Sequence, residues 1–95
     1  MNKKFELLLD DTVEYFGIKL FRIRALISFG NVEAGDIGGY IEKEENLSIY
    51  GKALVSGDAR VYGNARVYGD ALVSGDALVY GNTRVYGNAL VSGDA

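Results

Sequence analysis

The side chains in this chain that could take part in chemistry recur at fixed intervals in its C-terminal half. Carboxylates at Asp58, Asp76 and Asp94 are evenly spaced, a regularity that could align metal ligands. The calcium-binding β-roll, however, requires a nine-residue Gly-Gly-x-Gly-x-Asp repeat, and the period here is six residues. We therefore expect these carboxylates to make local hydrogen bonds in turns, and we predict no metal site and no cofactor.

The residue types that most often carry catalysis are missing. The chain has no histidine and no cysteine, so it lacks the usual general base and cannot form a thiolate nucleophile. The repeated glycines are spaced as corners, and none of them forms a glycine-rich phosphate loop. Carboxylates and tyrosines remain, but no constellation of them stands out. We therefore predict that the protein is not an enzyme and has no catalytic residues.

Eight six-residue repeats fill the chain from Ser48 to Ala95: SIYGKA, LVSGDA, RVYGNA, RVYGDA, LVSGDA, LVYGNT, RVYGNA and LVSGDA. Alternate side chains of a strand share a face, so the aliphatic second residue and the small sixth residue should both point inward. The glycine, usually followed by Asp or Asn, suits a corner with positive φ. The predicted interior column is Ile49, Val55, Val61, Val67, Val73, Val79, Val85 and Val91.

A longer period shows how the corners close into coils. The hexad LVSGDA recurs unchanged as every third hexad, at Leu54–Ala59, Leu72–Ala77 and Leu90–Ala95. Three hexads therefore complete one coil, and successive coils should stack at about 4.8 Å. The sequence thus predicts an all-β fold: a short triangular parallel β-helix over residues 47–95, with fewer than three coils. A small N-terminal β cap should occupy residues 1–46.

The hexads, together with the leader LFRIRALISFGNVEAGDIGGYIEKEENLS, resemble hexapeptide-repeat proteins that form left-handed parallel β-helices. More narrowly, they look like a bacterial and phage group often labelled as transferases. The resemblance covers Leu20–Ala95, and GDIGGYIEKEENLS is its more specific part. It implies a left-handed coil and a phage or prophage origin. Acyltransferases of this class use a histidine base, which this chain lacks, so a degenerate acyltransferase-like protein is kept only as an alternative.

The N-terminal part has a different composition from the hexads. We expect strands over Phe5–Leu9 and Ile18–Leu26, a turn at Asp10–Thr12 and a bend at Phe16-Gly17. We also expect a core of large aromatic residues, because all four phenylalanines are in this part: Phe5, Phe16, Phe21 and Phe29. This cap should cover the first coil, since the open end of a solenoid exposes unpaired strand edges and core.

Two features connect this part to the hexads. Ile41 and Leu47 keep the six-residue spacing, so the period begins before the first clean hexad. The charged run Glu42–Asn46 is expected to be a solvated connector.

The charge is uneven along the chain. Residues 1–46 contain six Lys and Arg against nine Asp and Glu, whereas residues 47–95 contain four of each. Because neither part has a basic excess, we predict no nucleic-acid partner. Since no long apolar run or signal-peptide pattern is present, we also predict no membrane partner. The expected location is the cytoplasm, which would be the host cytoplasm for a phage protein.

Outward-facing residues define two candidate surfaces. The candidate partner platform consists of tyrosine columns and neighbouring arginines: Tyr50, Tyr68, Tyr86, Arg66, Arg84, Tyr62 and Tyr80. These rings and cations could equally hold the coils in register. The candidate oligomer face is a leucine and serine stripe: Leu54, Leu72, Leu90, Ser56, Ser74, Ser92 and Val91. Scattered surface leucines are also common in proteins with no such contact.

We expect a homo-oligomer, with a dimer favoured, formed through the leucine and serine stripe or through an uncapped C-terminal coil. Two non-enzymatic functions follow as hypotheses. The first is a self-associating scaffold or protein-binding module. The second is a small phage inhibitor that docks onto a host protein, such as a defence component.

Overall fold

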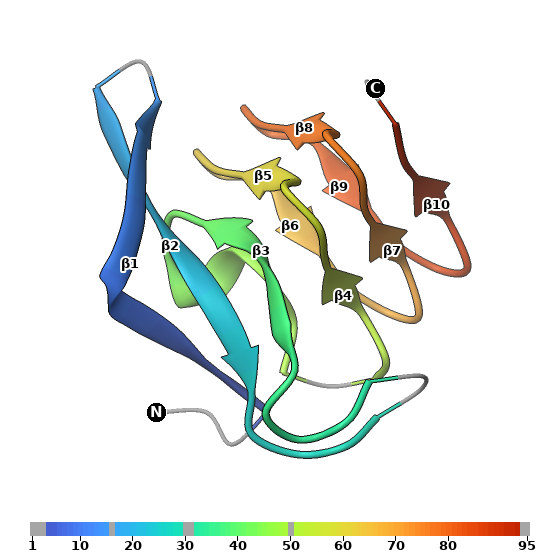
Figure 1. Ribbon diagram of the computed structural model, residues 1–95. Helices are drawn as coiled ribbons and strands as arrows, with labels where there is room; N and C mark the ends of the chain where they lie inside the picture. The colour runs from blue at the N-terminus through green and yellow to red at the C-terminus, as the bar shows by residue number, and fades with distance from the viewer. Residues whose placement is uncertain (1–3, 16, 30–31, 50, 94–95) are drawn as a thin grey trace.

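A computed structural model describes residues 4–15, 17–29, 32–49 and 51–93 of the chain (Figure 1). Apart from one short 3-10 helix, the regular secondary structure of these residues is β. The N-terminal part contains β1 (Phe5–Tyr15), β2 (Ile18–Ala25), β3 (Ile37–Ile41) and the short 3-10 helix η1 (Glu44–Asn46). The repeats contain β4 (Leu54–Val55), β5 (Arg60–Val61), β6 (Arg66–Val67), β7 (Leu72–Val73), β8 (Leu78–Val79), β9 (Arg84–Val85) and β10 (Leu90–Val91). No helix in these ranges is long and apolar enough to cross a membrane.

The repeats form a solenoid with three sides, and each side is a separate sheet (Figure 1). We call these the hairpin face (β3, β5 and β8, extended by β1 and β2), the Leu/Ser face (β4, β7 and β10) and the Arg/Tyr face (β6 and β9). Pairs between repeats are parallel and join every hexad to the third one after it, as in Val55 with Val73 and Val61 with Val79. The predicted β-helix fold is thus confirmed.

The valine column forms the interior of the coils. Val55, Val61, Val67 and Val73 are fully buried, and each buried valine contributes roughly 1.5–3 kcal/mol. Small neighbours such as Ala71 leave room for the next layer, and glycine makes the corners. Gly69 has a φ of 70°, and a Cβ there would lie 2.9 Å from the nitrogen of Gly87 in the next coil. Glycine is therefore required both by the backbone conformation and by the close stacking of corners.

The predicted place of Ile49 in this interior column is wrong. Leu47, rather than Ile49, forms the parallel bridge to Val67, and Ile49 is 41% exposed. Ile41 is likewise paired with Val61. Along the sequence, Ile41 and Leu47 are therefore each two positions further from their partners than residues paired within the repeats are. The corner between Leu47 and Val55 therefore holds two extra residues, and the regular hexads begin with LVSGDA.

The head, residues 4–46, extends the hairpin face with an antiparallel hairpin. β1 is one strand with a register shift between Leu8 and Thr12, so the turn predicted at Asp10–Thr12 is instead a bulge. Gly17 has a φ of 80° at the hairpin connection, and Phe16 lies outside the described residues. The strand continues because its pairing with β2 resumes after the bulge.

The predicted aromatic core of the head is only partly correct. Phe5 is buried, but Phe21 and Phe29 are half-buried. The fully buried large hydrophobic side chains of the head are aliphatic, and they include Leu20, Ile23 and Ile41.

Candidate docking faces and the base of the solenoid

Each coil receives backbone hydrogen bonds from the coil before it. The N–H of Leu54 donates to Ala71 O, and the N–H of Leu72 donates to Ala89 O, both at 3.0 Å. The first coil (β4, β5 and β6) has equivalent carbonyls at Ala53, Ala59 and Ala65, at the base of the stack. Because these carbonyls are in the buried interior, a missing donor would cost about 1–3 kcal/mol each.

Three different donors from the head satisfy these carbonyls. Lys4 Nζ donates to Ala53 O at 2.6 Å. Tyr40 N, in β3, donates to Ala59 O at 2.9 Å. Asn46 Nδ2 donates to Ala65 O at 2.8 Å. One strand and two side chains therefore take the place of a preceding coil.

Asn46 makes hydrogen bonds through both the nitrogen and the oxygen of its side-chain amide. Its Nδ2 also donates to Gly63 O at 3.3 Å, and its Oδ1 accepts from the N–H groups of Glu42 (3.0 Å) and Lys43 (2.9 Å). The Glu42 carboxylate accepts from Gly63 N at 2.8 Å. The prediction that Glu42–Asn46 is a solvated connector is only partly correct. Glu44 and Glu45 are exposed, but Asn46 is fully buried and ties the connector to the first coil.

Glycines at the start of β3 let the head approach the first coil closely. A Cβ at Gly38 would lie 2.6 Å from Val55 O, and one at Gly39 would lie 2.7 Å from Ala59 O. Neither glycine has a positive φ, so the requirement is steric. The motif GDIGGYIEKEENLS thus contains the groups that seat the head: two glycines, the donor strand and Asn46.

Lys4 is a buried cation at the same base. The residue is 2% exposed, its Nζ also donates to Ser48 O at 2.9 Å, and it lies 4.5 Å from the centre of the Phe29 ring. Burial lowers the pKa of Lys4 to about 8, and the charge of Asp70 opposes this shift only in part. The charged form is disfavoured because the site removes it from water.

The stability of the protein should therefore rise with pH in the alkaline range. Between the folded pKa of about 8 and the ordinary value of 10.5, the unfolded chain binds more protons than the folded one. The contribution of Lys4 is complete above the upper value and is lost as pH falls through the lower one. Urea unfolding should show a gain of roughly 1–2 kcal/mol from pH 7.5 to 9.5 that Lys4→Met lacks. Parallel pH profiles for the two proteins would contradict this expectation.

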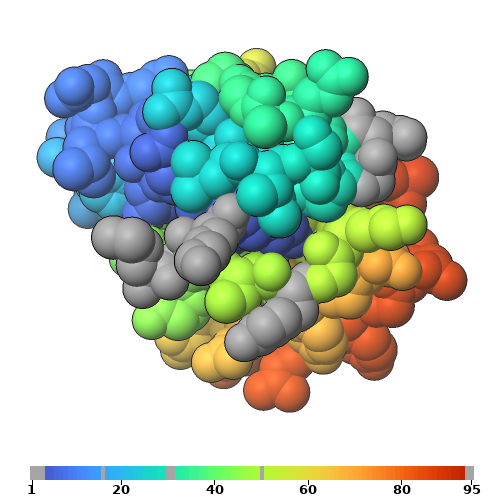
Figure 2. All heavy atoms as spheres, turned by 90° about the horizontal axis from the view of Figure 1, so that it is seen from below, coloured from blue at the N-terminus to red at the C-terminus, as the bar shows by residue number. Residues whose placement is uncertain are grey.

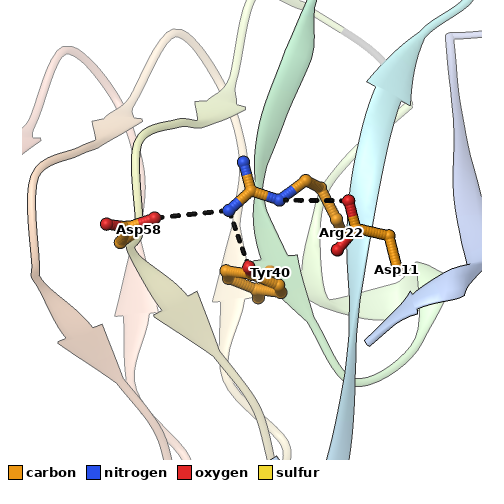
Figure 3. Close-up of polar contacts among 4 residues, drawn as sticks. All are labelled: Asp11, Arg22, Tyr40 and Asp58. Carbon is orange, nitrogen blue, oxygen red and sulfur yellow. Dashed lines mark hydrogen bonds and ion pairs between the residues drawn. The ribbon is translucent and has the colours of Figure 1, made fainter. Parts of the chain in front are cut away.

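A second contact between head and coils centres on Arg22 (Figure 3). Its guanidinium donates to Tyr40 Oη at 2.7 Å and lies 3.3 Å from Asp58 and 3.7 Å from Asp11. Asp11 belongs to the bulge of β1, so the bulge brings a carboxylate to this cation. The hydrogen bond to Tyr40 is the main cause that raises the pKa of Arg22 above its ordinary value, and partial burial opposes it.

The corner carboxylates Asp58 and Asp70 bond to groups outside their own turns. Asp58 pairs with Arg22, and Asp70 Oδ1 accepts from Lys52 N at 3.3 Å in the neighbouring coil. Asp94, expected in the same column as Asp58 and Asp76, lies outside the described residues.

The predicted tyrosine columns lie on two different faces. Tyr62 and Tyr80 stack at 5.4 Å on the hairpin face, and Tyr68 and Tyr86 stack at 5.2 Å on the Arg/Tyr face. Tyr50 lies outside the described residues. The structure thus does not bring all platform residues together. Tyr15, which has no place in the repeats, packs edge-on against Tyr62 at 5.9 Å.

The hairpin face is consequently partly covered by the head. Arg60 lies 5.2 Å from the centre of the Tyr15 ring. Burial, followed by the nearby Tyr15 and Tyr80, raises the pKa of Tyr62 above its usual value of 10.0. We take this column as a contact between head and coils. The alternation of residues in β1 could have indicated this contact, but Tyr15 lies outside the repeats, so their period could not predict it.

The Arg/Tyr face is open and polar. Arg66 and Arg84 are directly paired in the parallel register of β6 and β9, and both are exposed. Beside them a hollow of about 280 Å³ is lined by Lys43, Glu45, Asn64, Ala65, Arg66, Asn82 and Arg84. Asn64 Nδ2 donates to Asn82 Oδ1 at 3.3 Å, and Lys43 Nζ donates to Asn64 Oδ1 at 3.5 Å.

The Leu/Ser face carries its side chains in register. Leu54, Leu72 and Leu90 are paired across β4, β7 and β10. Leu90 is 65% exposed, whereas Leu54 and Leu72 are half-buried, so the stripe is less exposed than its sequence predicts. Ser56 and Ser74 are half-buried, Ser92 is exposed, and Val91 is half-buried.

This face leads into an apolar cavity at the base. The cavity holds about 300 Å³ and is lined by Phe5, Ile23, Ala25, Phe29, Val32, Asp36, Ile37, Gly38, Leu47, Leu54 and Ser56. It lies below β4, which in the described chain pairs only with β7 above it. Figure 2 shows the first residues of β1 in this seam between head and coils.

The comparison with known families agrees with the architecture. The profile of the YdcK beta solenoid repeat family matches residues 59–75 and 83–95, which are hexad residues. No curated protein matches the chain. Together, the three-sided stack and this match make the chain a β-solenoid repeat protein. Its left-handedness and its membership of the group labelled as transferases stay predictions.

Proposed function

We propose that this protein is a non-enzymatic β-solenoid module that binds a second copy of itself through the Leu/Ser face. The observation that carries this proposal is the in-register column Leu54–Leu72–Leu90 on a flat sheet. Aliphatic side chains that are aligned on a flat surface can pack against the same surface of another copy, as in a two-fold dimer.

Charge supports the choice of this face. The chain has a net charge of −3, so two copies repel each other in general. The outward residues of the Leu/Ser face are uncharged, since each strand and the residue after it read Leu, Val and Ser. Contact there places no like charges opposite each other and leaves the serine hydroxyls free to exchange hydrogen bonds with the partner copy.

Leu72→Glu should convert the dimer to a monomer, because it would bury two carboxylates without partners at the centre of the contact. Size-exclusion chromatography with light scattering at micromolar concentration measures this. Leu78→Glu is the matched control, since Leu78 is half-buried at the equivalent position of the hairpin face and should leave the dimer intact. A monomeric wild type would reject self-association. A dimeric Leu72→Glu protein would move the contact elsewhere, with the last coil as the next candidate.

A second candidate function is a small phage-type inhibitor that docks onto a host protein. The observation that favours it is the exposed pair Arg66 and Arg84 on a face separate from the proposed dimer contact. Tyr and Arg are the residues most often enriched where proteins bind tightly. A single stoichiometric host protein captured by both wild type and Leu72→Glu would support this candidate; capture of only further copies of the chain would reject it.

A further inference from the structure

The five arginines of the chain fall into two groups. Arg22 pairs with Asp11 and Asp58, Arg24 pairs with Glu6, and Arg60 lies over the ring of Tyr15. Arg66 and Arg84 make no ion pair, side-chain hydrogen bond or cation–π contact within the part of the chain that the structure describes. The two arginines without partners are also the two that lie side by side.

Their arrangement is electrostatically unfavourable unless something else is present. Cross-strand neighbours of like charge destabilise a sheet, and these two residues are directly paired on strands about 4.8 Å apart. Lys43 adds a third cation at the wall of the same hollow. Glu45 is the single carboxylate among the residues that line the hollow, so the lining keeps a net positive charge.

The lining residues supply donors for oxyanions. Guanidinium groups bind carboxylates with two parallel hydrogen bonds, and the amide of Asn82, which accepts from Asn64, keeps its own N–H groups for a ligand. Next to the arginines, the stacked rings of Tyr68 and Tyr86 form a flat apolar surface, with Tyr86 58% exposed. Charged and aromatic groups thus lie together on one open face.

We propose that the Arg/Tyr face binds an acidic peptide segment of a partner protein, with its carboxylates on Arg66 and Arg84 and its backbone over Tyr68 and Tyr86. This inference rests on the second candidate function and names the chemistry of its partner. A protein segment fits better than a nucleic acid, because Glu45 at the hollow and the net charge of −3 oppose a long polyanion. A short acidic peptide meets less of this repulsion, because it carries few charges and its side chains can turn away from Glu45.

The test is fluorescence anisotropy with a labelled hexaglutamate peptide at low salt. Arg84→Gln should weaken binding by about tenfold, and the variant with both Arg66→Gln and Arg84→Gln should bind at least about a hundredfold more weakly. Arg24→Gln removes the same charge from an exposed arginine of the head and should change affinity less than about twofold. All three positions are exposed strand sites, and circular dichroism checks that each variant is folded.

Several results would overturn the proposal. These are no binding of hexaglutamate, equal binding of a hexaglutamine peptide, or an equal loss of affinity in Arg24→Gln. Pyrophosphate that competes at lower concentration than the peptide would also overturn it, by assigning the hollow to a small oxyanion. Capture of a host protein by the doubly substituted variant would reject this site while keeping the inhibitor function, so the two failures are distinguishable.

Discussion

Replacing Asn46 with alanine is expected to lower the free energy of unfolding by about 4 kcal/mol, because several buried backbone groups lose their partners at once. The side chain accepts from Glu42 N and Lys43 N and donates to Gly63 O and Ala65 O, and it is fully buried. Urea unfolding followed by circular dichroism measures the change.

Asn64→Ala provides the matched control for this experiment. Asn64 is exposed, and its side-chain hydrogen bonds with Lys43 and Asn82 are exposed as well, so its loss should cost less than about 0.5 kcal/mol. If Asn46→Ala proved as mild as Asn64→Ala, Asn46 would not be the donor that closes the base, and the connector would be as loosely held as its charge suggests.

Replacing Gly39 with alanine is expected to lower the free energy of unfolding by about 3 kcal/mol through steric overlap. The added Cβ would lie 2.7 Å from Ala59 O and 2.8 Å from Val55 Cγ1. A backbone carbonyl cannot rotate away as a flexible side chain can, so β3 would have to move off the first coil. That movement would also stretch the hydrogen bond from Tyr40 N to Ala59 O, which is 2.9 Å long. The same urea titration measures this effect.

A substitution of Gly81 is the control that separates the effect of steric overlap from the effect of losing a glycine. Gly81 has a φ of 68° and no atom within 4 Å of a Cβ, so Gly81→Asn meets only the mild strain of positive φ. Asparagine tolerates this region, and the expected cost is below about 1 kcal/mol. Equal losses for Gly39→Ala and Gly81→Asn would argue against the close approach of β3 to the first coil.

The regular coils could be predicted from the sequence because every repeat obeys the same constraint. The same inward valine and the same corner glycine recur in successive hexads, at positions such as Val61 and Gly69. Because the pattern is repeated many times, a single irregular position does not obscure it. The exclusion of Ile49 from the interior column could not be predicted in this way. SIYGKA matches the hexad in composition, yet the corner before β4 holds two extra residues and places Leu47 in the column instead.

The contacts at the base of the solenoid could not be predicted from the sequence for a different reason. Lys4 and Asn46 each act once, through contacts with residues distant in the sequence, so no periodicity marks them. Both also belong to residue types that are mostly found on surfaces, which makes burial the less expected state. Their roles follow only when the carbonyls of the first coil are seen to need donors.

For the candidate faces, the three-hexad period was sufficient to group residues but not to describe their surroundings. It placed Tyr80 above Tyr62 and Tyr86 above Tyr68, as the stacked rings show. It carried no information about Tyr15 covering one of these columns. It also carried no information about the bulge of β1, which places the carboxylate of Asp11 near Arg22.

The three-sided coil also constrains how genes of this kind can change in length. A duplication of three consecutive hexads would add one full layer and keep every downstream side chain on its own side of the prism. A duplication of a single hexad would rotate everything after it by one side, so that leucines would continue a row of arginines. Duplications therefore keep the three faces intact only when they comprise a whole coil of three hexads, although the repeat seen in the sequence is one hexad.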